Sequence, residues 1–303
     1  MVNITHKANS LRQAIASATV IVSKPGTMEA IKNRMVPKGD VLEFSRAAGL
    51  LAIKKTSDVI PDCHPLPVEY AAIQYDFDGL QIIITVEVHT IYKTGVEVEA
   101  MHGAMITALT MYDMLKPIDK GIEIATVKLL SKKGGKTDFN TEDAAGIRCA
   151  IIVCSDTAAA GTSKDETGAV IAEKIKKFHL SVAVEIIPDN MEMIQAKATQ
   201  HSEDGIQLLL FAGGTGLSAK DITPEAIDPL LDRKIPGIME AARAYGQERM
   251  PYAMLSRGIA GFIKNSLVIT LPGSPRGAVE TIDAIFPYVL HVFRVAKGMR
   301  HSG

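Results

Sequence analysis

The sequence of 303 residues has no tryptophan, only three cysteines and no excess of either charge. Lys and Arg total 33 against 34 Asp and Glu, so no basic surplus points to nucleic acid or to an anionic membrane. Hydrophobic runs such as Leu208–Phe211 are far shorter than the roughly 20 residues that cross a bilayer. Polar residues such as His6 and Lys7 interrupt the N-terminus, and we therefore expect no signal peptide.

The three cysteines do not form a disulfide framework. Cys149 and Cys154 lie five positions apart in one predicted strand, and their side chains therefore point to opposite faces and cannot pair with each other. An odd, small number of cysteines is typical of a reducing compartment, so we expect a cytoplasmic protein.

Length and composition indicate two ordinary globular domains. Hydrophobic residues make up 47% and charged residues 22%, which excludes disordered and collagen-like chains. A polar, glycine-rich stretch begins after Ser131 and resembles a linker. We expect a first domain over residues 1–138, a linker over 139–146 and a second domain over 147–303.

The first half has the pattern of an α+β layer pair with an antiparallel sheet. Asp78-Gly79 between two apolar runs predicts a hairpin with a type I′ turn. A capping box, Thr94 to Glu97, predicts the start of a helix that ends before Pro117. The expected elements are strands 68–77 and 80–91 and helices 38–55 and 94–116.

The second half alternates buried-looking strands with helices, which favours a mainly parallel sheet covered on both faces, an α/β fold of three layers. In such sheets, ligands bind at the carboxyl ends of the strands. The expected strands are 149–154, 182–187, 206–211 and 267–271, and the expected helices are 167–178, 191–200, 224–231, 236–245 and 278–295.

Several polar residues of the first half suit chemistry, although each has a structural alternative. His64 lies between Pro61 and Pro65, where rigid backbone can aim an imidazole, or it is simply a turn histidine. Asp113 and Lys116 share a helix face and are equally explained as a surface ion pair. Lys38 precedes Asp40, an acid that also suits the first turn of a helix.

Taken together, these segments resemble one family. The strings KGDVLEFSRAAGLLAIKKT, IPDCHPL, KTGVEVEAM, ALTMYDMLK and LLSKKGGK are similar in order and spacing to the cyclic pyranopterin monophosphate synthases of molybdenum-cofactor biosynthesis. The resemblance implies a ferredoxin-like α+β fold, a hexamer with sites at subunit interfaces, and no tightly bound cofactor. It also implies rearrangement of a cyclised dihydroguanosine triphosphate to cyclic pyranopterin monophosphate with loss of pyrophosphate.

The same resemblance implies site residues. It places the catalytic groups at Lys38, His64, Asp113 and Lys116, and the substrate-binding groups at Lys7, Arg12, Cys63, Glu97 and Glu99. One position departs from the family, which commonly has Asp where this chain has Asn3. The amide keeps the shape and a hydrogen bond but loses the charge.

In the second half, a glycine-rich loop and three strand-end acids suit phosphate chemistry. Gly214 to Ala219 satisfies G-x-G-x-x-A, but Pro224 comes too soon for a Rossmann helix. Thr223 and Pro224 instead predict the N-cap and first residue of a later helix. We therefore expect either a tight turn or a nest of backbone N–H groups that holds a phosphate.

The three acids lie at successive strand ends. Asp156, Asp189 and Asp221 follow predicted strands or the glycine loop, where a single aspartate is usually a turn or cap residue. Three at one sheet edge suit Mg²⁺ and phosphoryl or nucleotidyl transfer.

These segments also resemble one family. CSDT, IIPDN, FAGGTGLSAKDITPEA, MLSRGIAG and LPGSPRG are similar to the molybdopterin adenylyltransferases. The resemblance implies a trimeric α/β fold that transfers AMP from Mg-ATP to molybdopterin, with Asp189 and Asp221 catalytic and Asp221 a Mg²⁺ ligand. It implies ligand binding at Ser155, Asp156, Thr157, Gly213, Gly214, Thr215, Gly216, Ser256, Gly273 and Ser274.

The sequence thus predicts a bifunctional enzyme of molybdenum-cofactor biosynthesis that uses pterin and nucleotide substrates. We expect a homo-oligomer, trimeric or hexameric, with other enzymes of this biosynthesis as further partners and neither nucleic acid nor membrane among them. The alternative is an active synthase fused to a catalytically silent pterin-binding or oligomerising module. A purely structural oligomer is a third hypothesis, which leaves the cluster of Lys38, His64, Asp113 and Lys116 without a purpose.

Overall fold

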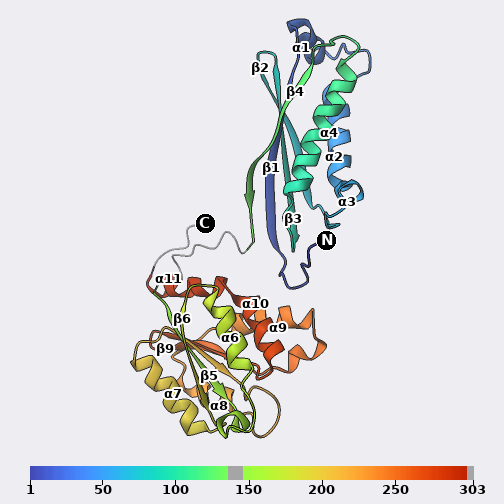
Figure 1. Ribbon diagram of the computed structural model, residues 1–303. Coiled ribbons are helices and arrows are strands. Elements are labelled where there is room, and N and C mark those ends of the chain that lie inside the picture. The colour runs from blue at the N-terminus through green and yellow to red at the C-terminus, as the bar shows by residue number, and fades with distance from the viewer. Residues whose placement is uncertain (136–145, 299–303) are drawn as a thin grey trace. The chain divides into compact units, whose positions relative to one another are not determined.

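A computed structural model describes residues 1–135 and 146–298, and its chain divides into two compact units, Met1–Asp138 and Phe139–Gly303 (Figure 1). The predicted linker, residues 139–146, lies outside the described residues except for Gly146. Within the described ranges, no helix combines the length and the apolar character needed to cross a membrane.

The first unit is a four-stranded antiparallel sheet with its helices packed on one face (Figure 1). The strand order is β2-β3-β1-β4, which is the ferredoxin-like arrangement, and the expected fold is confirmed. Its elements are β1 (Ser10–Ile21), α1 (Pro25–Lys32), α2 (Val41–Lys54), α3 (Thr56–Val59), β2 (Tyr70–Asp78), β3 (Gln81–Tyr92), α4 (Glu97–Leu115) and β4 (Glu123–Lys133).

Two local predictions for this unit are wrong in detail. The hairpin forms, but Asp78 pairs with Gln81, and among these turn residues only Gly79 has a positive φ, of 56°. The turn is therefore Gly79-Leu80, with the φ pattern of type II′ rather than type I′. Helix α4 begins at Glu97 with Val96 at the N-cap position, so Thr94 does not cap it. The Glu97 carboxylate contacts Lys132 at 3.1 Å instead of closing a capping box.

The loop that follows α4 is fastened by Asp119, which is only 2% exposed. Its carboxylate accepts hydrogen bonds from the Ser23 N–H and hydroxyl, the Thr27 hydroxyl and the Gly121 N–H. Burial alone raises the pKa of Asp119, but these hydrogen bonds outweigh it and lower the pKa to about 2. The charged carboxylate therefore stabilises the loop that starts at Lys116.

We predict that Asp119→Asn destabilises the protein by about 3 kcal/mol at pH 7, because an amide cannot accept all of these hydrogen bonds. The pKa of Asp119 is lower in the folded protein than the value of about 3.9 expected in the unfolded chain, so its carboxylate stabilises the folded state above that pH. This contribution is lost as the pH falls toward 2. Urea unfolding between pH 7 and pH 3 should therefore show the two proteins converging in acid. Asp58→Asn, at an exposed ion pair, is the control and should cost less than about 1 kcal/mol.

The second unit is a six-stranded sheet in the order β6-β5-β7-β10-β9-β8. The first four strands are parallel and the last two join antiparallel. Its elements are β5 (Arg148–Cys154), α5 (Asp156–Ala159), α6 (Thr167–Lys176), β6 (Ser181–Ile187), α7 (Met191–Glu203), β7 (Leu208–Ala212), α8 (Thr223–Ile227), η3 (Asp228–Leu230), β8 (Arg233–Lys234), α9 (Pro236–Gln247), η4 (Pro251–Leu255), β9 (Ala260–Ile263), β10 (Ser266–Leu271), α10 (Pro275–Ile285), η5 (Tyr288–His291) and α11 (Val292–Ala296).

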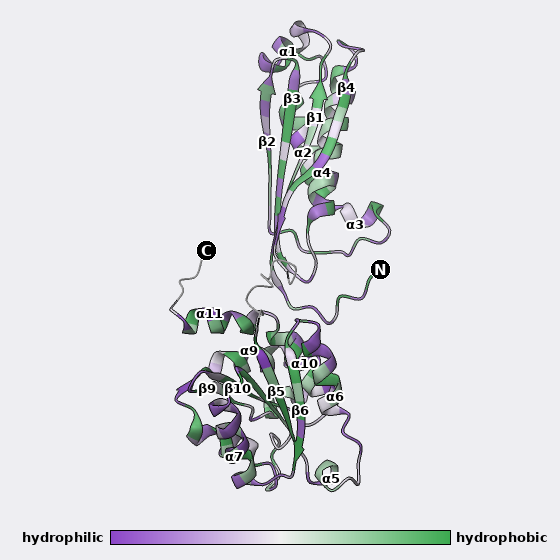
Figure 2. Ribbon diagram, turned by 60° about the vertical axis from the view of Figure 1, so that its left-hand side comes forward, coloured by the Kyte–Doolittle hydropathy of each residue, from purple (hydrophilic) through white to green (hydrophobic). Residues whose placement is uncertain are grey.

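Helices cover both faces of this sheet, so the expected three-layer α/β fold is confirmed. Cys149 belongs to the core shared with α6, α9 and α10, and Cys154 to the core shared with α7 and α8. The two cysteines thus lie on opposite faces, as predicted. The strands between these cores are mainly hydrophobic (Figure 2), and β10 is buried along its whole length.

Two helix predictions for the second unit need correction. The single helix expected over 278–295 is divided, because α10 ends at Ile285 just before Phe286-Pro287, and proline cannot continue the hydrogen-bonding pattern. At α8, the N-cap is Ile222 and Thr223 is already helical. The Thr223 side chain makes no cap hydrogen bond there, although Pro224 stands in the first turn as expected.

Candidate functional sites

At the carboxyl end of α4, the first unit brings together three of its predicted catalytic residues. The Nζ of Lys38 lies 2.7 Å from Asp113 Oδ2 and donates to the Asp113 carbonyl at 2.9 Å. The Nζ of Lys116 lies 2.7 Å from Asp113 Oδ1. One aspartate therefore holds two lysines side by side at the protein surface.

This ion-pair cluster keeps its groups charged. The hydrogen bonds from Lys116 and Lys38 lower the pKa of Asp113 to about 2, and Asp113 in turn raises the pKa of Lys116. Asp113 therefore stabilises the charged, protonated form of Lys116 in this arrangement. Within one chain, the cluster is a pair of fixed cations suited to binding an anion.

A second group lies at the amino end of α4, around a cavity of about 400 Å³ lined by Cys63, His64, Glu97 and Glu99 among others. The Cys63 thiol lies 3.2 Å from Glu99 Oε1. Burial, together with Glu99, raises the pKa of Cys63 to about 12, and burial raises the pKa of Glu99 itself. Both groups are therefore biased toward their protonated forms.

His64 has one ring nitrogen engaged by the backbone. Its Nε2 lies 2.8 Å from the Val2 carbonyl oxygen. Because a carbonyl oxygen only accepts, Nε2 carries the hydrogen in this arrangement and Nδ1 is the acceptor atom. The histidine is thus oriented as a base at Nδ1.

Of the cationic residues Lys7, Arg12 and Lys132, Lys132 contacts this second group directly. The Arg12 Nε donates to the Tyr92 carbonyl at 3.2 Å, and Gly135, at φ +99°, passes so close that a Cβ there would lie 2.1 Å from the Arg12 guanidinium. Lys132 adds its charge beside Glu97. Lys7 lies in the segment before β1, where its backbone N–H donates to the Ile4 carbonyl.

Asn3 serves a local role. Its Oδ1 accepts hydrogen bonds from the Thr5 N–H at 2.9 Å and from the Thr5 hydroxyl at 2.7 Å. An aspartate could accept the same two bonds, so the amide preserves this turn without the charge.

The two groups lie at opposite ends of one helix. Glu97 and Asp113 are separated by 16 residues of α4, which corresponds to about 24 Å along its axis. Figure 1 shows the same separation, with α3 close to one end of α4 and α1 close to the other. The residues that the sequence predicts for a single site therefore do not meet within one chain.

In the second unit, the predicted residues gather at the carboxyl ends of the parallel strands. Ser155 follows β5, Asp189 follows β6 and Gly213 follows β7. A cavity of about 320 Å³ lies there, lined by Ser155, Gly213, Gly214 and Gly273 among others. The Ser155 hydroxyl caps α5 and contacts the Thr157 hydroxyl at 3.2 Å.

The acids at this edge are coupled. The Asp189 N–H donates to Asp156 Oδ1 at 3.0 Å, and the Asp156 N–H donates to Asp189 Oδ2 at 3.3 Å. Burial raises the pKa of Asp189, and the charges of Asp156 and Asp221 add to this shift. The other carboxylate oxygen, Asp189 Oδ1, is buried and accepts no hydrogen bond from the described residues. A cation or a ligand donor can satisfy it.

These residues fit Mg²⁺ only as part of a magnesium–nucleotide complex. Among residues 1–135 and 146–298, no three acidic, histidine or cysteine side chains converge as a metal site. Mg²⁺ commonly takes one or two carboxylates and fills its remaining positions with phosphate oxygens and water. The buried, unsatisfied Oδ1 of Asp189 suits such a role.

The glycine loop makes a tight turn, and Gly213 packs against the backbone at the end of β5. Gly213 and Gly214 have φ of 113° and 60°, and a Cβ on Gly213 would lie 2.2 Å from the Cys154 carbonyl oxygen. The Gly213 N–H donates to Leu271, so the nest expected over the whole loop does not include Gly213. A Cβ on Gly216 would lie 2.9 Å from the Asp221 carboxylate.

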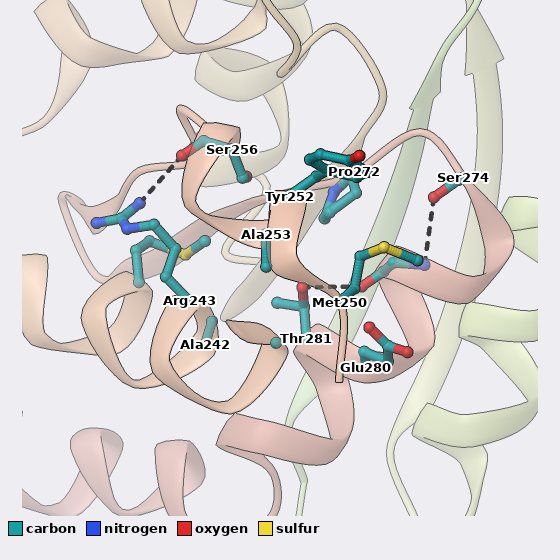
Figure 3. Close-up of a pocket in the computed structure, with 13 residues that line it drawn as sticks. Ala242, Arg243, Met250, Tyr252, Ala253, Ser256, Pro272, Ser274, Glu280 and Thr281 are labelled. Atoms are coloured by element: carbon teal, nitrogen blue, oxygen red, sulfur yellow. Dashed lines mark hydrogen bonds between the residues drawn. The ribbon is translucent and has the colours of Figure 1, made fainter. Parts of the chain in front are cut away.

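Ser256 and Ser274 line a separate pocket of about 210 Å³ between α9, η4 and α10. Figure 3 shows the two serines on opposite sides of this pocket, with apolar side chains such as Met250 between them. The Ser274 hydroxyl caps α10, accepting from the Gly277 N–H. The two serines thus line a different pocket from the strand-end cavity, although Gly273 and Pro275, on either side of Ser274, line that cavity.

Three residues at these sites were missed by the sequence reasoning. Lys164 lines the strand-end cavity, and only its place in the segment GTSKDETG could have indicated it. Arg257 links the glycine loop to Asp221 and Glu225. Asp119 fixes the loop next to Lys116. The last two act through contacts across loops, which leave no signal in residue spacing.

The structure thus defines a protein of two separate units, one α+β and one α/β, and each unit matches a family model of its own. The family model of the MoaC family matches residues 1–135. A second model, described as a probable molybdopterin binding domain, matches residues 150–291.

A bifunctional molybdenum cofactor biosynthesis protein of Chlorobaculum tepidum is 36% identical over 303 residues, which is 100% of this chain and 96% of the relative. The chain therefore belongs to the family of bifunctional molybdenum cofactor biosynthesis proteins, and the two resemblances seen in the sequence are confirmed.

Relatives also match each half alone. A cyclic pyranopterin monophosphate synthase of Nostoc is 45% identical over 141 residues, covering 45% of this chain and 82% of the relative. The crystal structure of the molybdopterin biosynthesis enzyme MoaB of Thermus thermophilus is 38% identical, with a TM-score of 0.48, and the match covers 50% of this chain and 98% of that one.

Proposed function

We propose that the first unit is a cyclic pyranopterin monophosphate synthase whose active site forms between two copies of the chain. One copy supplies Lys38, Asp113 and Lys116, and the other supplies His64 and its neighbours. The observation that carries this proposal is the separation of these two groups along α4, because chemistry on one small substrate needs them within reach of the same atoms.

The surface between the two groups supports contact with a second copy. On α4, Met105, Leu109 and Tyr112 are 47%, 51% and 38% exposed, and their spacing places them on one helix face. On the adjacent α2, Phe44 and Leu51 are also largely exposed. Exposed apolar side chains that gather on neighbouring helices are typical of protein interfaces, and an interface here would bring half-sites of two copies together.

The chemistry of each half-site suits the proposed reaction. Lys38, Lys116 and Arg12 can hold the triphosphate of the substrate through charge-assisted contacts. His64 can take a proton at Nδ1, and Glu99, whose pKa is raised by burial, can donate one as the rings open and close. Incubation of the full chain with the cyclised dihydroguanosine triphosphate should yield the pterin product, detected by fluorescence after oxidation.

We propose further that the second unit transfers AMP from Mg-ATP to molybdopterin. The observation that carries this proposal is Asp189, whose buried and unsatisfied Oδ1 lies at the glycine loop beside Asp156 and Asp221. Bound Mg²⁺ would neutralise phosphate charge there. Asp189 and Asp221 would hold the metal–nucleotide complex, and the backbone of Gly214 to Gly216 and Lys164 would contact the phosphates.

The competing hypothesis for this unit is a catalytically silent pterin-binding module. Retention of both Asp189 and Asp221 favours transfer, because binding alone requires no carboxylates at the position of a metal–nucleotide complex. Incubation of the full chain with molybdopterin and Mg-ATP separates the two hypotheses. Adenylylated product supports transfer, whereas molybdopterin binding without any product supports the silent module.

A further inference from the structure

Arg257 joins three pieces of the candidate nucleotide site in the second unit. Its Nε donates to the Gly216 carbonyl at 2.7 Å, and its Nη2 donates to the Asp221 carbonyl at 2.5 Å. Its Nη1 is paired with the Glu225 carboxylate, and its own N–H donates to the Thr215 carbonyl at 3.2 Å. A single side chain thus holds the glycine loop, the Asp221 segment and the start of α8.

These contacts set the position of the Asp221 carboxylate. Asp221 Oδ2 accepts the Ser218 N–H at 2.8 Å, and the Asp221 N–H donates to the Ser218 carbonyl at 2.9 Å. Two hydrogen bonds therefore join the two ends of the short turn from Ser218 to Asp221. Arg257 donates to the carbonyl of Asp221, at the end of this turn, and to the carbonyl of Gly216, which precedes it. With Oδ2 committed, Oδ1 is the oxygen left to face a bound ligand.

The arginine itself is not a free phosphate ligand. Its three bonded nitrogens are directed at protein acceptors, and the Glu225 carboxylate neutralises its charge. A planar guanidinium reaches three acceptors at fixed angles, which an ammonium cannot do. The contacts of Arg257 therefore fix the glycine loop and the Asp221 segment relative to each other, and they leave no guanidinium nitrogen directed at a substrate.

We propose that Arg257 is a positioning residue that fixes Asp221 and the glycine loop relative to each other for nucleotidyl transfer. The inference rests on the proposed adenylyl transfer for its catalytic consequence, but its structural part stands independently. Loss of Arg257 should leave the fold intact, since the side chain is 32% exposed, and should let the Ser218 turn open.

The test compares the full-length Arg257→Gln and Arg257→Lys proteins with the wild type. Amide hydrogen exchange should speed up at Ser218 and Asp221 in both variants, while the amides of β7 keep their protection. The kcat of AMP transfer should fall by about 100-fold, because misplacement of a catalytic group on this scale costs that much. The KM for Mg-ATP should change by less than about threefold.

Arg148→Lys is the matched control, because Arg148 also clamps two carbonyls, of Asp204 and Gly205, at the opposite end of β5. It should leave exchange at Ser218 and the rate of transfer unchanged. Unchanged exchange at Ser218 in both Arg257 variants would overturn the proposal, as would full rescue of kcat by lysine, which would mean that only the charge matters. If the wild type transfers no AMP, the proposed transfer fails, and the exchange measurement still decides the role of Arg257.

Discussion

Lys116→Ala and Lys38→Ala are each expected to abolish formation of cyclic pyranopterin monophosphate while leaving the protein folded. Both side chains bind Asp113 at the surface, 52% and 39% exposed, so their removal creates no cavity in the core. Each removes a cation from the half-site that we assign to the substrate triphosphate. Product fluorescence after oxidation measures the reaction, and circular dichroism with thermal unfolding measures the fold.

Lys177→Ala provides the control, because Lys177 is an exposed helical lysine paired with Glu173 in the other unit. It should leave pterin formation at the wild-type rate. Near-normal turnover in a folded Lys116→Ala or Lys38→Ala protein would remove the ion-pair cluster at the end of α4 from the proposed synthase site.

Mixing two inactive variants should restore activity if the site forms between copies. Lys116→Ala chains are co-expressed with His64→Ala chains. In each pair that contains one chain of each kind, one of the two shared sites carries both mutations and the other carries neither. With random pairing in a symmetric interface, about a quarter of the wild-type activity should return. The recovered rate is measured on the whole co-expressed mixture, without selection for mixed pairs.

A second mixture shows whether the recovery has the proposed cause. Lys116→Ala and Lys38→Ala belong to the same half-site, so every site in their mixture lacks one lysine and no activity should return. If both mixtures stay inactive, the site is not shared between copies. If both recover, exchange or contamination with wild-type protein accounts for the signal.

The general architecture was predictable from the sequence because hydrophobic periodicity is a local property. In β3, Ile82, Ile84, Val86 and Val88 alternate as fully buried residues, a period that indicates a strand directly. Strand β1 was missed because its buried positions include Ala14, Ala16 and Ala18, and alanine has little β-propensity. These small residues belong to the same core as the alanines of α4, a pairing that only the folded chain reveals.

Site residues were likewise predictable where a local pattern places them, and were missed where contacts between distant segments place them. The strand-end positions of Asp156 and Asp189 were predictable, because the carboxyl ends of parallel strands share one edge. The length of α4 was predictable, but the distance between His64 and Lys116 was not, since no motif indicates that the loop of His64 packs at the amino end of α4. Arg257 and Asp119 act through contacts between loops far apart in sequence, for which the chain carries no periodic signal.

We propose that one chain performs two reactions with two separate sets of residues. The most direct test assays both reactions on the same preparations of the full-length wild type, Lys116→Ala and Asp189→Asn. We predict that the wild type forms the pterin and transfers AMP, that Lys116→Ala loses only pterin formation, and that Asp189→Asn loses only AMP transfer. A wild-type protein that forms the pterin but transfers no AMP at any Mg-ATP concentration would contradict the claim, as would loss of both activities in either folded variant.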